Sequence, residues 1–231
     1  MNKKGVNKMN NNTLDNIESI ALDGIESLTD IILKNEIIEK VPIANIATSI
    51  IKTGEMIYNK NLFRQTVSFI ESLNKQEISK EKAEKYKEKV FKNEKRESEE
   101  IERVLLYLNK NIDTEKSRIL AKFYASYVNQ EINWNKFCEY ATIINQIFIE
   151  DLPIIYDIYK DEETKVVIYE NYKISRLMAT GLLSNYSGAI TVQELSKGKS
   201  GVRNIYEKNV LGELFVKIAT RKEIIMLNNK V

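Results

Sequence analysis

Residues 177–195, LMATGLLSNYSGAITVQEL, interrupt a sequence that is otherwise helical in pattern and poor in glycine. Residues 189–195 are rich in strand formers, 196–201 carry turn residues, and 202–209 alternate as a returning strand would. The stretch therefore predicts a β-hairpin inside a mainly helical protein. Five of the eight glycines lie between positions 181 and 212, namely Gly181, Gly188, Gly198, Gly201 and Gly212.

The composition limits the chemistry that the chain can perform. Its 231 residues are 43% apolar and 29% charged, which is ordinary for a soluble globular protein. Cys138 is the sole cysteine and histidine is absent, so an intrachain disulfide and the usual zinc, haem and non-haem iron ligand sets are excluded. We expect no cofactor, no metal, and a cytoplasmic location.

An enzymatic role is also disfavoured, although carboxylate or lysine chemistry stays open. The missing histidine removes the commonest general base. No P-loop, dinucleotide-binding glycine fingerprint or nucleophile elbow is present. The acidic clusters Glu97, Glu99 and Glu100, and residues 161–163, are interpreted as solvated helix ends. The sequence therefore predicts a non-enzymatic protein.

The N-terminal half divides into a tail and a helical region. Residues 1–12 are interpreted as a disordered tail, and residues 13–110 as a helical region. Within it, residues 75–103 hold ten basic and nine glutamate residues around a thin apolar stripe of Ala83, Tyr86 and Val90. This pattern predicts a charged, solvent-exposed central helix that links two halves of the chain, with a protruding interaction arm as the alternative.

Residues 111–231 are predicted to hold a helical hairpin followed by a smaller domain. The first helix begins with Asp113 or Thr114 as its cap, and the second with Asn133 or Asn135. A short helix over 152–160 and another over 166–180 precede the hairpin strands, and helical spacing resumes at 210. Cys138 is expected to be buried and inert. The interior side of the second helix is predicted to carry Phe137, Tyr140, Ile143, Ile144, Ile147 and Phe148.

The order helix, stop, strand, basic turn, strand, helix resembles the end of a winged-helix domain, in which a hairpin wing follows the third helix. The resemblance covers about 80 residues. It is carried by Leu177, Gly181, Leu182 and Leu183 at the exit of the third helix and by Leu211, Gly212 and Phe215 at the start of the closing helix.

Together with IIEKVPIANIATSIIKTG at 37–54, this pattern makes the chain similar to abortive-infection proteins of the Abi-alpha type, which are found on phages, prophages and mobile islands. The resemblance implies a role in phage–host conflict. It is one of pattern and brings no site residues with it.

The partner is expected to be a protein or a second copy of the chain, with nucleic acid as the alternative. From position 165 onward there are eleven basic and five acidic residues, a bias that favours a polyanion. In a nucleic-acid complex, the third helix would face a groove and the wing would contact phosphates. The candidate residues for either partner are Asn171, Lys173 and Arg176 on the third helix and Lys197, Lys199 and Arg203 on the wing.

A membrane-associated effector is a further alternative. The helix predicted over 41–57 carries an apolar run flanked by Lys40 and Lys52, but it is too short to cross a bilayer. Such a helix could lie on a membrane surface. A buried core helix explains the same residues with fewer assumptions.

Overall fold

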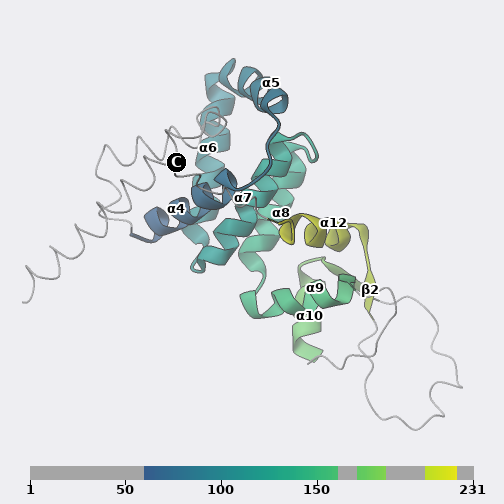
Figure 1. Cartoon of the computed structure of the whole chain (residues 1–231). Helices are drawn as coiled ribbons and strands as arrows, with labels where there is room; N and C mark the ends of the chain where they lie inside the picture. Colours follow the sequence, from purple (N-terminus) through teal and green to yellow (C-terminus); the bar gives the residue numbers. More distant parts are fainter. Residues whose placement is uncertain (1–59, 161–170, 186–205, 223–231) are drawn as a thin grey trace, which may run out of the picture. The chain divides into compact units, whose positions relative to one another are not determined.

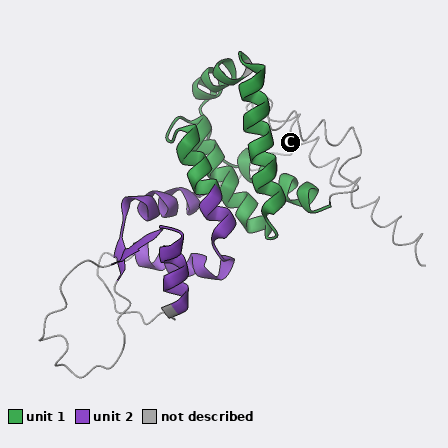
Figure 2. Cartoon of the chain, turned by 180° about the vertical axis from the view of Figure 1, so that it is seen from behind, with its two compact units in different colours: residues 1–141, 223–231 green, residues 142–222 purple. Residues whose placement is uncertain are grey.

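The computed structural model describes residues 60–160, 171–185 and 206–222 (Figure 1). These residues form eight α-helices, one short 3-10 helix and a two-stranded sheet, which confirms the prediction of a mainly α protein. They divide into two compact units, with described residues 60–141 in unit 1 and 142–222 in unit 2 (Figure 2). The chain passes from unit 1 to unit 2 between residues 141 and 142, and the helix that follows residue 110 packs extensively on the first described helix.

The described part of unit 1 is built around two helices, α4 (Lys60–Asn74) and α7 (Thr114–Val128), whose contact is the most extensive between any two described elements. On α4, Phe69, Ile70 and Leu73 recur at helical spacing and are fully buried. Most of α7 is buried, including Leu120 and Phe123. Small polar residues such as Ser72 also lie in this contact and allow the two backbones to approach closely, since the Ser72 hydroxyl donates to the Arg118 carbonyl at 3.1 Å.

The charged central helix predicted over 75–103 is two helices, α5 (Lys80–Phe91) and α6 (Glu94–Lys110). The chain breaks at Lys92 and Asn93 because the Asn93 side chain caps α6, accepting a hydrogen bond from the Arg96 amide at 3.1 Å. The thin apolar stripe of α5 is buried against α6 and α7. The segment is therefore part of the unit 1 bundle and not a solvated link.

Both predicted starts of the helical hairpin are confirmed. Asp113 precedes α7, and Asn133 precedes α8 (Trp134–Gln146), where its side chain accepts from the Lys136 amide at 2.9 Å. The turn between them places Gln130 at φ 59°, a left-handed conformation. Because α8 ends at Gln146, Phe148 lies beyond the helix and is 51% exposed, so its predicted interior position is wrong.

After the end of α8, the described part of unit 2 contains a 3-10 turn η2 (Ile149–Asp151) and the helices α9 (Leu152–Lys160), α10 (Asn171–Ala179) and α12 (Val210–Ala219). Between α10 and α12, the strands β1 (Leu183–Asn185) and β2 (Tyr206–Lys208) pair antiparallel, with Leu183 opposite Lys208. The strand β2 falls inside the range 202–209 predicted for the returning strand, whereas the strand predicted over 189–195 lies outside the described residues. Leu182 and Leu183 are buried, so the chain enters the sheet directly after the turn at Gly181, whose φ is +80°.

Tyr159 and Asn209 join the elements of unit 2. The Asn209 amide donates to the Tyr159 hydroxyl at 2.9 Å, and that hydroxyl donates to the Leu182 carbonyl at 2.7 Å. The Asn209 side chain donates to the Gly181 carbonyl at 3.0 Å and accepts from the Gly212 amide at 2.8 Å, capping α12. One residue therefore ties the exit of α10 to the start of α12. The winged-helix assignment stays a prediction, because residues 186–205 lie outside the described residues.

Candidate protein-interaction surface

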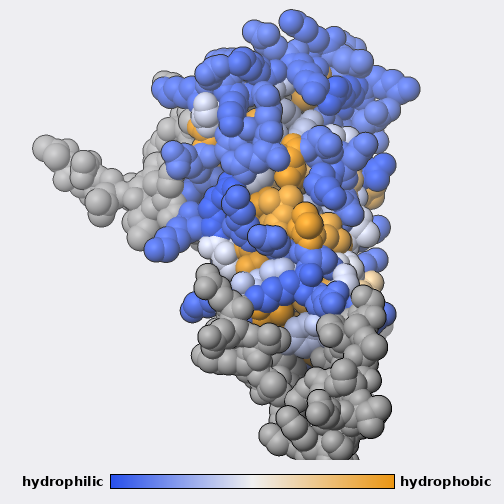
Figure 3. Space-filling view, turned by 90° about the vertical axis from the view of Figure 1, so that its right-hand side faces the viewer, coloured by the Kyte–Doolittle hydropathy of each residue, from blue (hydrophilic) through white to orange (hydrophobic). Residues whose placement is uncertain are grey.

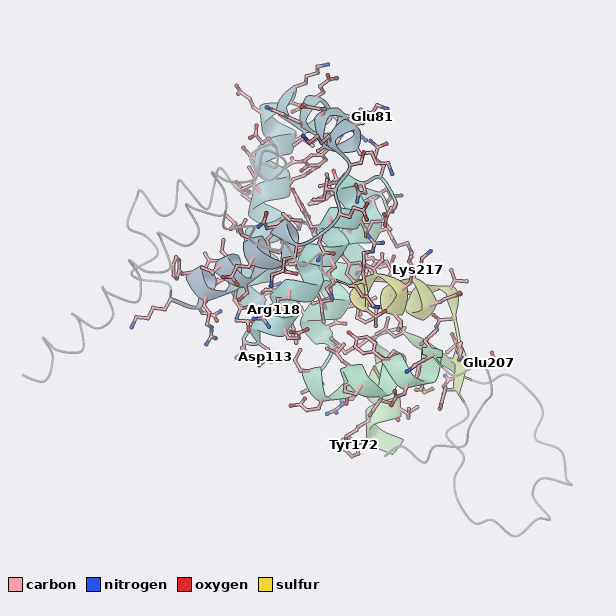
Figure 4. All side chains as sticks on the ribbon, viewed as in Figure 1. Glu81, Asp113, Arg118, Tyr172, Glu207 and Lys217 are labelled. Atoms are coloured by element: carbon pink, nitrogen blue, oxygen red, sulfur yellow. The ribbon has the colours of Figure 1, made fainter. Side chains whose placement is uncertain are left out.

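The helix α10 presents one buried and one exposed face. Ile174 and Leu177 are buried, as the 3-residue spacing of a core-facing stripe requires. Tyr172 is 55% exposed, and Ser175 is exposed as well. Figure 4 labels Tyr172 at the free end of this helix. The exposed face is the part of unit 2 on which the predicted binding residues Lys173 and Arg176 lie.

Arg176 is held in a bidentate ion pair. Its Nε donates to Asp151 Oδ2 at 2.9 Å and its Nη2 donates to Asp151 Oδ1 at 2.7 Å. Asp151 is 1% exposed, whereas the Arg176 side chain is 34% exposed. The hydrogen bonds to this carboxylate raise the pKa of the Arg176 guanidinium. The fork geometry fixes the guanidinium in orientation as well as in position.

Two exposed aromatic rings lie against the guanidinium of Arg176. Its central carbon is 4.2 Å from the ring centre of Phe148 and 5.1 Å from that of Tyr172. Cation–π contacts of this kind hold rings in place. Phe148, Arg176 and Tyr172 form what we call the aromatic patch.

The aromatic patch changes the role expected of Arg176. Its charge is paired with Asp151 and its planar group is covered by the rings, so it positions Phe148 and Tyr172 and is poorly placed to read a base edge. Lys173 is the other basic residue of α10, and its Nζ lies 5.8 Å from the Tyr172 ring centre.

Of the remaining predicted site residues, only the backbone of Asn171 belongs to the described part of the chain. Asn171 begins α10. Lys197, Lys199 and Arg203 lie outside the described residues. Phe148 and Asp151 were missed by the sequence analysis, since Phe148 was assigned to a helix interior and no local pattern links Asp151 to a residue 25 positions later.

The charge balance of unit 2 weakens the polyanion argument. Residues 142–222 hold eleven basic and ten acidic residues, so the bias seen from position 165 onward disappears when the boundary follows the structural unit. A nucleic-acid interface is normally strongly basic.

A second polar cluster lies inside unit 1, and it corrects the interpretation of Glu100 as solvated. Glu100 is 2% exposed and accepts from the hydroxyl of Tyr86 at 2.9 Å and of Tyr127 at 2.6 Å. Since the Tyr86 proton goes to Glu100, Tyr124 donates to Tyr86 across 2.7 Å. Arg96 Nε also donates to Glu100, at 3.4 Å. We call these five residues the Glu100 cluster.

The Glu100 cluster is closed and structural in character. Burial raises the pKa of Tyr86, Tyr124 and Tyr127, so all three are neutral donors near pH 7. Among the residues that the structure describes, no group of histidine, cysteine, aspartate or glutamate could hold a metal ion. Cys138 is only partly buried, so its expected burial is wrong, although desolvation still raises the pKa of its thiol.

Comparison with known proteins returned no match to a family, a curated protein or a solved structure. None of the described helices is both long and apolar enough to cross a membrane. The helix predicted over 41–57 lies outside the described residues.

Proposed function

We propose that the chain is a non-enzymatic binding protein that contacts a protein partner through the aromatic patch of unit 2. The observation that carries the proposal is the pair of half-exposed rings, Phe148 and Tyr172, fixed by Arg176 and the buried Asp151. Aromatic and arginine side chains are enriched among the residues that dominate binding energy in protein interfaces. Rings that are already held in place lose little conformational freedom on binding.

Nucleic acid is the weaker alternative. The near-neutral balance of unit 2 and the paired charge of Arg176 leave little positive charge on the described face of α10. A stacking role for the exposed rings on single-stranded nucleic acid would need a basic groove beside them. A role of the basic wing residues Lys197, Lys199 and Arg203 would give binding that weakens steeply with salt.

The biological context that we propose is phage–host conflict, with a winged-helix-like C-terminal unit as the contact module. This part of the proposal is supported by the resemblance to abortive-infection proteins and by the order helix, strand, strand, helix in unit 2. The partner is then a protein of the phage, of the host cell, or a second copy of this chain.

The test is a capture experiment with the full chain from phage-infected and uninfected cells, with and without nuclease. The double variant Phe148→Ser/Tyr172→Ser removes both rings from exposed positions and should leave the fold intact. Val210→Ser is the matched control, because Val210 is an apolar residue of the same unit that is 80% exposed. We expect nuclease-insensitive capture of a protein that the double variant loses and the control retains.

The purified chain separates the remaining outcomes. Self-association in sedimentation that only the double variant abolishes would identify the partner as a second copy. The proposal would be overturned in favour of nucleic acid by a capture that is sensitive to nuclease and does not need the two rings. Such capture should be lost in the triple variant Lys197→Ala/Lys199→Ala/Arg203→Ala. The substitution Arg176→Lys keeps the positive charge but removes the planar guanidinium that makes two hydrogen bonds. If this variant is captured more weakly while the salt dependence of capture is unchanged, Arg176 acts by positioning the rings.

A further inference from the structure

We propose that α5 opens and closes as a unit over the Glu100 cluster while α4, α6 and α7 stay folded. Among the described helices of unit 1, α5 has the most polar sequence. Hydrophilic side chains cover the end of the unit where α5 lies (Figure 3), and Figure 4 labels Glu81 on its outer side. The exposed charged residues of α5 are Lys80, Glu81, Lys82, Glu84, Lys85, Lys87, Glu88 and Lys89.

Among the α5 side chains that the structure describes, few are apolar and buried. Its buried side chains in the described set are Ala83, Tyr86 and Val90, and its contacts with α6 and α7 are few beside those of α4 with α7. Local opening is favoured where few apolar contacts are lost. Surface ion pairs such as Lys92 with Glu88 join residues of the same segment and do not oppose its release.

The buried hydrogen bond that holds α5 to α6 is the one from the Tyr86 hydroxyl to the Glu100 carboxylate. Breaking this bond does not leave the Glu100 carboxylate without hydrogen-bond donors. When Tyr86 leaves, Glu100 keeps its hydrogen bonds from Tyr127 and Arg96, because these come from α7 and from α6 itself. Tyr124 loses its acceptor in Tyr86 and gains water instead. The cost of leaving a buried charge unpaired, which would otherwise prevent opening, is therefore avoided.

The two ends of α5 are suited to act as hinges. At the first end, the Ser79 amide donates to Asn129 Oδ1 at 3.1 Å, and Asn129 Nδ2 donates to the Glu77 carbonyl at 2.7 Å. This clamp holds the chain before α5 to the end of α7. At the other end, Asn93 caps α6 independently of α5. The segment between these fixed points can move without unravelling its neighbours.

Opening uncovers a carboxylate oxygen of Glu100 beside the rings of Tyr124 and Tyr127, whose centres lie 6.0 Å apart. A carboxylate flanked by aromatic rings suits a basic side chain, as Arg96 shows at the edge of the same cluster. The motion of α5 would therefore control access to an acidic and aromatic surface that the closed form hides. This inference concerns unit 1 and does not depend on the function proposed for unit 2.

Hydrogen exchange of the full chain, read by mass spectrometry, tests the proposal. We expect the amides of 80–91 to exchange at least about tenfold faster than the protected amides of α7. Tyr86→Phe keeps the ring and removes the anchor, so it should speed exchange of α5 by about tenfold or more and leave α7 within about twofold.

Tyr107→Phe is the matched control. Tyr107 is a buried residue of α6 whose hydroxyl donates to the Cys138 carbonyl at 3.2 Å, away from α5. It should leave the exchange of 80–91 unchanged relative to α7. The proposal is overturned if α5 and α7 exchange at one common rate, if Tyr86→Phe speeds both equally, or if it speeds neither.

Discussion

Units 1 and 2 use the same residue types for different purposes. In unit 1, Phe69, Tyr124 and Phe137 are fully or almost fully buried, and the ring centre of Tyr124 lies 5.7 Å from that of Phe69 and 5.5 Å from that of Phe137. In unit 2, Phe148 and Tyr172 are half exposed and contact a guanidinium instead of a core. The aromatic residues of the unit 1 core therefore stabilise its fold, whereas Phe148 and Tyr172 stay at the surface of unit 2, on which the proposed contact depends.

Glu100 and Asp151, the buried acidic residues of the described structure, also differ in where their hydrogen-bond donors lie. Glu100 accepts from two tyrosine hydroxyls, neutral donors that fix the positions of helices inside unit 1. Asp151 accepts from a charged arginine that reaches the surface and positions exposed rings there. A buried carboxylate by itself therefore does not distinguish a structural cluster from the proposed contact surface. The location of its hydrogen-bond donors, in the interior or at the surface, makes that distinction.

The largest effect that separates the units is expected from Gly212→Ala in unit 2. A Cβ at this position would overlap the Tyr159 hydroxyl and the Leu182 carbonyl. Alanine gains about 1 kcal/mol of helix propensity, but a backbone carbonyl cannot move aside cheaply, so we expect a net loss of about 3–4 kcal/mol. Hydrogen exchange should show α9 and α12 losing protection while α4 and α7 keep theirs.

Val210→Ala provides the reference for this variant. Val210 lies in the same helix and is 80% exposed, so its truncation should change stability by under about 0.5 kcal/mol. Loss of protection in α4 and α7 together with unit 2 would break the comparison, because the units would then unfold as one.

A smaller effect, confined to unit 1, is expected from Glu100→Gln. The amide keeps one acceptor oxygen but turns an NH2 group toward hydroxyls that also need to donate, at a cost of about 2–3 kcal/mol. Urea unfolding followed by the fluorescence of Trp134 measures it, because this sole tryptophan lies 5.3 Å from Tyr127 between ring centres. Glu99→Gln, at an exposed neighbour, should cost under about 0.5 kcal/mol; equal losses would contradict a buried role for Glu100.

The smallest effect is a difference in pH dependence. Burial raises the pKa of Tyr86 in the folded state, so its contribution to stability is complete below its ordinary pKa of about 10 and is lost as pH rises above that value. At pH 11 this loss is on the order of 1 kcal/mol. Between pH 8 and pH 11 the free energy of unfolding should therefore fall less for Tyr86→Phe than for the wild-type chain. Urea unfolding followed by Trp134 fluorescence at each pH measures this difference. Equal losses would show that the hydroxyl titrates as freely in the folded state as in the unfolded one.

Local patterns in the sequence predicted much of the fold. The helices over 61–74 and 152–160 and the Asn133 cap follow from apolar spacing and capping chemistry, which act within one or two turns. The break at Asn93 was missed, although asparagine is a common cap, because the charge pattern continues across it. The short strand at Leu183 was missed, since Leu183 satisfies both a helix stop and a buried strand position.

The candidate surface could be predicted only in part. The exposed position of Arg176 on a helix was accessible from spacing, but its pairing with Asp151 and its contact with Phe148 join residues 25 and 28 positions apart. The Glu100 cluster likewise joins three helices. Such contacts depend on how helices pack, and a single sequence carries no local signal for them.

The position of Asn209 has a consequence for synthesis of the chain. Its hydrogen-bond partners Tyr159, Gly181 and Ser184 precede it by 50, 28 and 25 residues. At translation rates of about 5–20 residues per second, Tyr159 waits roughly 3–10 s for the residue that completes its hydrogen bonds. In the later part of this interval the apolar Leu182 and Leu183 have been synthesised, but the helix that follows Asn209 has not, so this part of unit 2 completes its packing only when synthesis of the chain is nearly finished.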